Sequence, residues 1–338
     1  MCLQLVALVK EFQKQTNHLL QLNELNAKVN ESLILHYSIS NLLLNRALKK
    51  DQLQTVRAQI DRMQQIAQET DHPQARTVYY RSEIYYHQVN STYPQARVFA
   101  REYLDFLRND KSQNNPTLIG GAWLQLAQIS LQLNELDEAR TCTEQAMEIY
   151  NDDQNMNSLV VLEVAFRISF YAKDYAGARQ QIERAFAHPQ FKASSTLSAK
   201  WHYFYACLHF SQNQFKEAYH KLNETAPLLA DKYGMNIHIR LLEIMIMHEM
   251  HNIDLLETKI LNMRQFVKRS QKNSEFFRSM ILIRILMAWY RNDYQFGKTL
   301  NQIRPKLLEL DAYHDDQPFR TSDFELIRLE QWMEQKSG

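Results

Sequence analysis

Glycine is scarce in this sequence. Six of the 338 residues are glycine, against an average usage of about 7%. Phosphate-binding loops and tight hairpin turns need this residue, because it adopts positive φ angles without steric cost. No Gly-x-x-x-x-Gly-Lys or Gly-x-Gly-x-x-Gly run occurs, so nucleotide binding through the usual loops is not expected. The scarcity favours helices joined by short polar turns.

Cysteine is also rare, and long apolar runs are missing. The three cysteines, Cys2, Cys142 and Cys207, are odd in number and widely separated. This pattern argues against a disulfide framework and favours a reducing, cytoplasmic setting. The apolar stretch from Leu3 to Val9 is too short to span a membrane and lacks the features of a signal peptide.

Neither sign of charge dominates. The chain carries 39 basic and 38 acidic side chains, so no global field attracts nucleic acid or an anionic membrane. We therefore expect no direct nucleic-acid binding and no membrane association. A protein or peptide partner of mixed polarity fits this composition better.

The sequence does contain a repeat of about forty residues. A polar turn precedes an aromatic or aliphatic residue, and a small or apolar residue follows three positions later, as in Tyr175 and Ala178. Extending the register gives seven such small or apolar residues, which we call the anchors: Val56, Ala96, Ala139, Ala178, Ala218, Leu256 and Gly297. Successive anchors are 38 to 43 residues apart, a spacing too regular for unrelated helices.

This repeat predicts an all-α solenoid, because stacked helical hairpins bury the apolar stripes that a single hairpin leaves exposed. We expect the first helices of seven hairpins over residues 31–48, 74–89, 116–133, 155–172, 194–211, 235–250 and 273–290. The predicted domains are an N-terminal amphipathic or capping helix over 1–30, seven hairpins over 31–310, and a C-terminal linker and capping helix over 311–338. Ser322 and Glu325 would open that last helix as a capping box.

The most regular unit carries Trp123, Leu126, Ala127, Ala139 and Ala146 at offsets that resemble the tetratricopeptide repeat. The resemblance covers roughly residues 31–310 and implies a right-handed α-α superhelix. The family's usual repeat is about 34 residues, so these longer units are more similar to repeat sensor domains of some bacterial regulators.

In that family the first helix of each unit lines a concave groove. The resemblance therefore implies nine candidate groove residues: Arg81, Tyr85, Gln128, Glu163, Arg167, Lys200, Tyr203, His238 and His248. A mixture of arginine, tyrosine and amide side chains suits an extended peptide, whose backbone amides and terminal carboxylate need partners.

Residues 3–29 also allow a heptad interpretation, in which six of eight seam positions are apolar. The two sets of seam positions are Leu5, Phe12, Leu19 and Asn26, and Leu8, Gln15, Leu22 and Val29. One hypothesis is a homodimer through a coiled coil. The simpler one is a helix that caps the solenoid.

The sequence offers no catalytic, cofactor-binding or metal constellation. His248 and His251 are three residues apart, whereas the zinc protease motif needs histidines four apart. We expect no cofactor. The leading hypothesis is a non-enzymatic scaffold or adaptor that binds a protein or peptide segment on the concave surface. A ligand-sensing module of a regulatory protein is the alternative, and an enzyme with an unrecognised site is a third that no motif supports.

Overall fold

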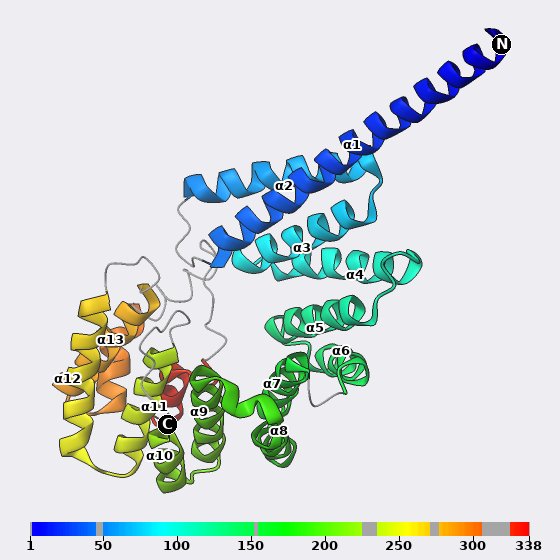
Figure 1. Ribbon diagram of the computed structural model, residues 1–338. Coiled ribbons are helices and arrows are strands. Elements are labelled where there is room, and N and C mark those ends of the chain that lie inside the picture. The colour runs from blue at the N-terminus through cyan, green and yellow to red at the C-terminus, as the bar shows by residue number, and fades with distance from the viewer. Residues whose placement is uncertain are drawn as a thin grey trace. The chain divides into compact units, whose positions relative to one another are not determined.

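Helices make up most of the part of the chain that the computed structural model describes, and no β-strand occurs there. Helices that are neighbours in the sequence pack against one another (Figure 1). The prediction of an all-α, repeat-like fold is confirmed at this level. The described residues are 2–44, 50–151, 155–224, 235–270, 277–305 and 325–337.

The chain forms two compact units, Met1–Ala122 and Trp123–Gly338. The helices of unit 1 are α1 (Cys2–Leu44), α2 (Lys50–Thr70), α3 (Pro73–Val89) and α4 (Tyr93–Asn109). In this unit α1 contacts both α2 and α3, and α3 pairs with α4. Its hydrophobic cluster is formed by Ile39, Val56, Ile60, Met63 and Val78.

Helix α1 passes through residue 30 without a break. The predicted capping helix and the predicted first helix of the first hairpin are therefore parts of one helix. The physical reason is that the sequence between residues 24 and 36 contains no glycine or proline, the residues that most readily interrupt a helix.

Unit 2 begins within α5 (Pro116–Gln132). One hydrophobic cluster extends in this unit from Leu159 to Met333. The later elements are α6 (Leu136–Ile149), α7 (Met156–Tyr171), α8 (Tyr175–Ala187), η1 (Pro189–Ala193), α9 (Ser195–Ser211), α10 (Phe215–Asn223), α11 (Met235–Glu249), α12 (Ile253–Ser270), α13 (Phe277–Arg291), a helical stretch over 296–305, and α15 (Leu329–Gln335). The first helices α3, α5, α7, α9, α11 and α13 agree with their predicted ranges to within about one turn.

One kind of turn closes six of the described hairpins. After α7, Lys173 has a φ of 58°, and the Asp174 N–H donates to the Ser169 carbonyl at 2.9 Å. This is the Schellman pattern, in which a left-handed residue ends a helix and the next N–H reaches five residues back. The equivalent positive-φ residues are Ser91, Asn134, Asn213, His251 and Asp293.

The anchors lie where the second helix meets the core. Six of the seven are fully buried: Val56, Ala96, Ala139, Ala178, Ala218 and Leu256. The seventh prediction is wrong, because Gly297 is exposed and has open space around it. The preceding turn holds two positive-φ residues, Asp293 and Tyr294, which shift the register. Thr299, fully buried, occupies the equivalent position.

The predicted capping box at the C-terminus is also wrong. Residues 325–328 are not helical, and α15 begins at Leu329. Glu325 is buried, so tertiary packing has overridden the local capping preference. Ser322 and most of the predicted linker fall within 306–324, outside the described residues. In the described ranges, no helix combines the length and apolar character needed to cross a membrane.

The anchors generate a test of the packing. We expect Ala178→Leu to lower the free energy of unfolding by about 2 kcal/mol, because the added atoms overfill a closed helix contact. Ala176 lies two residues earlier on the exposed side of α8, so Ala176→Leu is the matched control and should change stability little. Urea unfolding of both variants measures the difference. Equal effects would contradict the role of the anchor.

Candidate ligand-binding face

The predicted groove residues of unit 2 occupy matched positions on successive first helices. Glu163 and Arg167 precede the anchor Ala178 by 15 and 11 residues, and Tyr203 precedes the anchor Ala218 by 15. Because the hairpins share one turn and one anchor contact, equal offsets place side chains on the same side of each first helix. These offsets relate α7 to α9 through Glu163 and Tyr203. Lys200 and His238 each precede the next anchor by 18 residues and relate α9 to α11.

A charged cluster joins α7 to α9. The Glu163 carboxylate accepts hydrogen bonds from the Arg167 guanidinium, one turn later on α7, and from the Lys200 ammonium on α9. The three side chains are 13%, 11% and 20% exposed, respectively. We call them the Glu163 cluster. One carboxylate facing two cations leaves a net positive charge close to the surface.

The electrostatics of the Glu163 cluster oppose burial. Burial raises the pKa of the Glu163 carboxyl, but the charges and hydrogen bonds of Lys200 and Arg167 outweigh it and hold the pKa below its ordinary value. Arg167 also lies over the ring of the buried Phe204, with 5.8 Å between the guanidinium carbon and the ring centroid. Through this contact the Glu163 cluster is packed against the hydrophobic core.

Tyr203 is buried rather than available on the surface. Burial, followed by the neighbouring Cys207, raises the pKa of the Tyr203 hydroxyl well above its ordinary value. Burial likewise raises the pKa of the Cys207 thiol to about 12, which keeps the thiol protonated at neutral pH. The first-helix face of α9 is therefore covered at these positions.

The two histidines on α11 are also enclosed. His238 is buried, and the ring of His248 lies 4.9 Å from that of Trp289 and 5.0 Å from that of Phe296. Burial lowers the pKa of His248, which favours the neutral imidazole in this cluster. His251 instead forms the turn after α11, with a φ of 57°. His248 and His251 thus have different structural roles.

The remaining candidates lie elsewhere. Gln128 is half-buried on α5. Arg81 and Tyr85 are half-buried on α3 in unit 1, where Tyr85 packs against the hydrophobic cluster. Burial and the charge of Arg81 lower the pKa of His36 to about 4. Of the nine candidates, Arg167 and Lys200 both contact Glu163.

Glu249, which follows His248 directly, was not among the predicted site residues. Its carboxylate accepts a hydrogen bond from the Trp332 indole at 2.8 Å and pairs with Lys336, also at 2.8 Å. These partners lie 83 and 87 residues further along the chain, so no local pattern predicts the contact. Across the described residues, no group of three or more His, Cys, Asp or Glu side chains is arranged to hold a metal ion.

Comparisons with known proteins support the fold. No protein-family model matches the chain, and no curated protein matches its sequence. The crystal structure of BtubC (BKLC) from P. vanneervenii resembles it with a TM-score of 0.55 and 12% identity, over 66% of this chain and 92% of that one. At this identity the likeness concerns the fold alone, and it agrees with a helical, repeat-like architecture.

The Glu163 cluster predicts a pH-dependent stability. We expect Glu163→Gln to lower the free energy of unfolding at pH 7 by about 3 kcal/mol, because two cations lose their shared carboxylate. The folded pKa of Glu163 is lowered, so its contribution is complete above the unfolded pKa of about 4.3. It is lost as pH falls through the folded value.

The gap between wild type and Glu163→Gln should therefore close in acid. Urea unfolding from pH 7 to pH 3 measures it. Glu183→Gln on the exposed side of α8 is the control and should leave stability nearly unchanged. A gap that stayed constant over this range would argue against the ion cluster.

Proposed function

We propose that this protein is a non-enzymatic adaptor whose first helices bind a protein or peptide segment. In this proposal the chain is a right-handed superhelix of about seven tetratricopeptide-like hairpins with N- and C-terminal caps. The recurring turn and the buried anchors support a regular array. Cys142 and Cys207 are buried and are not joined in disulfides, which is compatible with the reducing, cytoplasmic setting that we propose for it.

The Glu163 cluster is the observation that carries the proposal. Charged side chains of two successive first helices meet at a partly exposed site, and Glu163 holds both cations in a fixed position. Arginine and lysine offer several N–H donors each, which suit the carbonyl groups and the terminal carboxylate of an extended peptide. The net positive charge favours a segment with an acidic side chain or a free C-terminus.

A ligand-sensing module of a regulatory protein is the second candidate. The burial of Tyr203 and His238 favours it, because a ligand that reached these positions would have to move whatever covers them. A sensor changes its compactness or oligomeric state when ligand binds, whereas an adaptor need not. Small-angle X-ray scattering with and without a bound peptide distinguishes the two.

The adaptor proposal is tested with a displayed peptide library carrying free C-terminal carboxylates. We expect peptides selected by the wild-type protein to bind Lys200→Ala about tenfold more weakly, because one charge-assisted hydrogen bond is lost. Lys216→Ala, on an exposed position of α10, is the control and should bind as wild type does. If every selected peptide bound Lys200→Ala as tightly as wild type, ligand binding would lie elsewhere.

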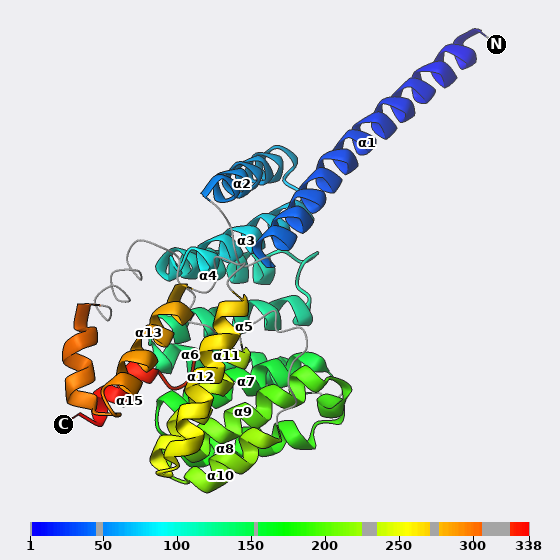
Figure 2. The same ribbon diagram turned by 90° about the vertical axis from the view of Figure 1, so that its left-hand side faces the viewer.

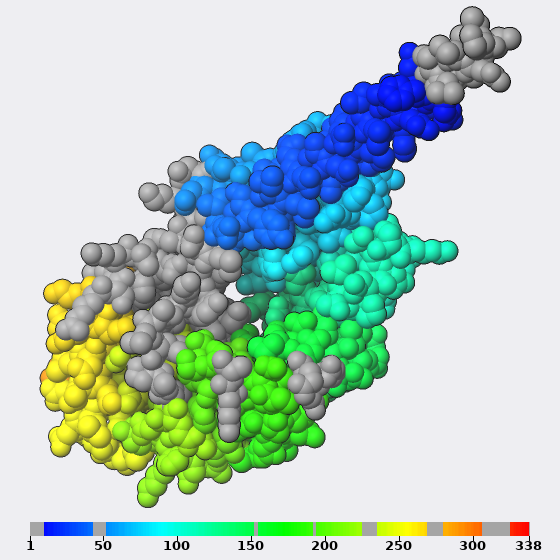
Figure 3. All heavy atoms as spheres, viewed as in Figure 1, coloured from blue at the N-terminus to red at the C-terminus, as the bar shows by residue number. Residues whose placement is uncertain are grey.

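The N-terminal half of α1 forms an arm, residues 2–24, that extends beyond α2 and α3 (Figures 1 and 2). Residues 10–24 are exposed, including Phe12 at 69% and Leu19 at 60%. In Figure 3 the blue part of the arm stands clear of α2 and α3 on the face in view. A helical arm with uncovered apolar side chains lacks the packing that normally stabilises helices.

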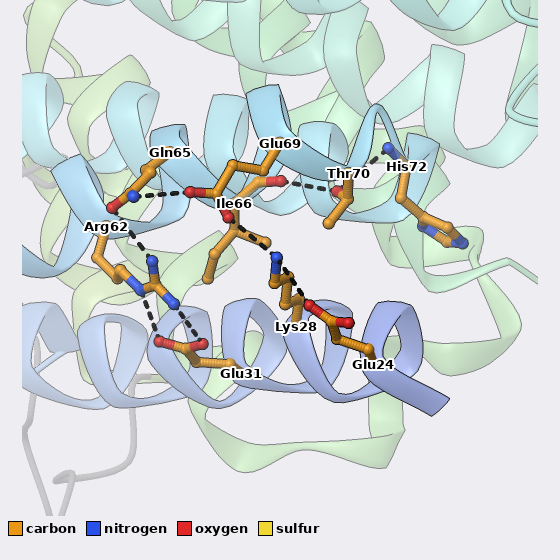
Figure 4. Close-up of polar contacts among 9 residues, drawn as sticks. All are labelled: Glu24, Lys28, Glu31, Arg62, Gln65, Ile66, Glu69, Thr70 and His72. Atoms are coloured by element: carbon orange, nitrogen blue, oxygen red, sulfur yellow. Dashed lines mark hydrogen bonds and ion pairs between the residues drawn. The ribbon is translucent and has the colours of Figure 1, made fainter. Parts of the chain in front are cut away.

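The other half of α1 is firmly attached to α2. Arg62 makes a two-pronged contact with Glu31, at 2.7 and 2.8 Å, and Lys28 pairs with Glu69 at 3.3 Å (Figure 4). Val29 on the same helix is buried. Leu22 lies seven residues before Val29, on the same face, and is exposed. The apolar stripe therefore continues outward from a covered region into an uncovered one.

We propose that a second copy of this chain covers the arm in a parallel coiled coil. In-register pairing sets Gln15 opposite Gln15 and Asn26 opposite Asn26, and an amide can both donate to and accept from its own copy. The apolar seam residues Phe12, Leu19 and Leu22 also meet their own copies. The apolar stripe of one copy is therefore complementary to the same stripe of a second copy.

Sedimentation tests this pairing. We expect a two-copy mass for wild type and a one-copy mass for the double variant Phe12→Lys, Leu19→Lys, which sets four ammonium groups in the seam. The matched control, Gln13→Lys with Asn17→Lys, adds the same charge on exposed positions outside the seam and should remain dimeric. A wild-type protein that stays monomeric as its concentration rises would contradict the proposal.

A further inference from the structure

The C-terminal segment Glu325–Ser337 touches more of the array than a terminal cap needs to. A cap of the last hairpin would contact α13 and the stretch 296–305. Trp332 does lie against Trp289 of α13 and Phe296, but it also contacts Glu249 and His248 on α11, one hairpin earlier. Figures 1 and 2 show α15 among the helices of this half of unit 2.

The Trp332 side chain contacts three aromatic rings and one carboxylate, those of His248, Trp289, Phe296 and Glu249, which we call the receptor. Its ring meets those of His248, Trp289 and Phe296 edge-on, with centroid distances of 5.4, 5.6 and 5.4 Å. Edge-to-face contacts of this kind are favourable for aromatic rings. The indole N–H is satisfied by Glu249, and the same carboxylate pairs with Lys336. The receptor therefore recognises both an aromatic ring and a nearby cation.

The segment is amphipathic. Leu326, Leu329, Trp332 and Met333 are buried in the hydrophobic cluster of unit 2, whereas Gln331, Glu334 and Gln335 are exposed. Helix α15 has seven residues, too few to be stable alone in water. The helical conformation of α15 therefore depends on its packing against the surface that it covers.

The same segment approaches the helices that carry the candidate face. The charge of Glu325 contributes to the raised pKa of the Tyr203 hydroxyl on α9, although burial is the main cause. Glu325 itself is buried. Tyr203, His248 and Glu249 all belong to first helices, so the segment runs along the side on which the proposed function places its ligand.

We propose that Glu325–Ser337 is an intramolecular occupant of the ligand-binding face, and that its pattern defines a class of ligand. That class is an amphipathic peptide with the arrangement Leu-x-x-Leu-x-x-Trp-Met-x-x-Lys, as at residues 326–336, which is helical from its second leucine. Such a peptide binds in trans when the chain's own segment is displaced. The inference rests on the proposed function and names both its partner and its regulation.

The test uses the full-length chain and a fluorescein-labelled synthetic peptide of residues 325–338. We expect wild type to bind the peptide weakly, because the tethered segment competes at a high effective concentration. Trp332→Ala removes the main side chain of the tethered segment and should bind the peptide at least about tenfold more tightly. Fluorescence anisotropy measures the affinity.

Three further variants make the outcome specific. Lys336→Ala loosens the segment without opening the core and should give a smaller increase in affinity. Glu249→Gln added to Trp332→Ala breaks the receptor and should remove most of the gain. Gln331→Ala, on the exposed side of α15, should bind as weakly as wild type. Circular dichroism and a cooperative thermal transition establish that each variant is folded.

Equally weak peptide binding by folded wild type, Trp332→Ala and Lys336→Ala would overturn the inference and leave the segment as a structural cap. That result is distinguishable from failure of the proposed function. Library peptides that depend on Lys200 would still bind the wild-type protein if the adaptor proposal alone were correct. Conversely, trans binding that Trp332→Ala gains and Glu249→Gln removes would support the inference without any Lys200-dependent peptide.

Discussion

The array depends on the close approach of the two helices in each hairpin. A buried anchor such as Ala178 allows the backbones to come together, and a left-handed residue such as Lys173 turns the chain back at the required point. Neither feature is sufficient alone, because a bulkier side chain at an alanine anchor would push those two helices apart even with a tight turn. Where the turn lengthens, as at Asp293 and Tyr294, the buried position moves with it to Thr299.

The repeat could be predicted from the sequence because its signals are local. The distance from the turn to the anchor is five residues in most hairpins, and helix length follows from the spacing of anchors. Long-range contacts could not be predicted in this way. Glu249 carries no pattern that anticipates Trp332, and Glu325 has the spacing of a capping box yet is buried. Long-range packing, which no local pattern describes, determines the position of both side chains.

The candidate face stays a prediction from offsets, and the structure shows only where its residues lie. Glu163, Arg167 and Lys200 lie together, with both cations paired to the one carboxylate. The same offsets gave Tyr203 and His238, which are buried, because an offset specifies the side of a helix but not what lies over it. Near Tyr203, one of the surrounding groups is the carboxylate of Glu325, which lies far along the chain. Such a neighbour cannot be predicted from an offset.

The turns of this protein also bear on how such chains diverge. Among the described residues, serine, asparagine, lysine, histidine, aspartate and tyrosine all adopt a positive φ in these turns, so the bend does not require one type of side chain. Mutation can then rewrite the turn sequence while the pitch of the array persists. Two arrays of this kind can therefore share a fold with little shared sequence. The structural neighbour at 12% identity is similar to this chain in fold alone.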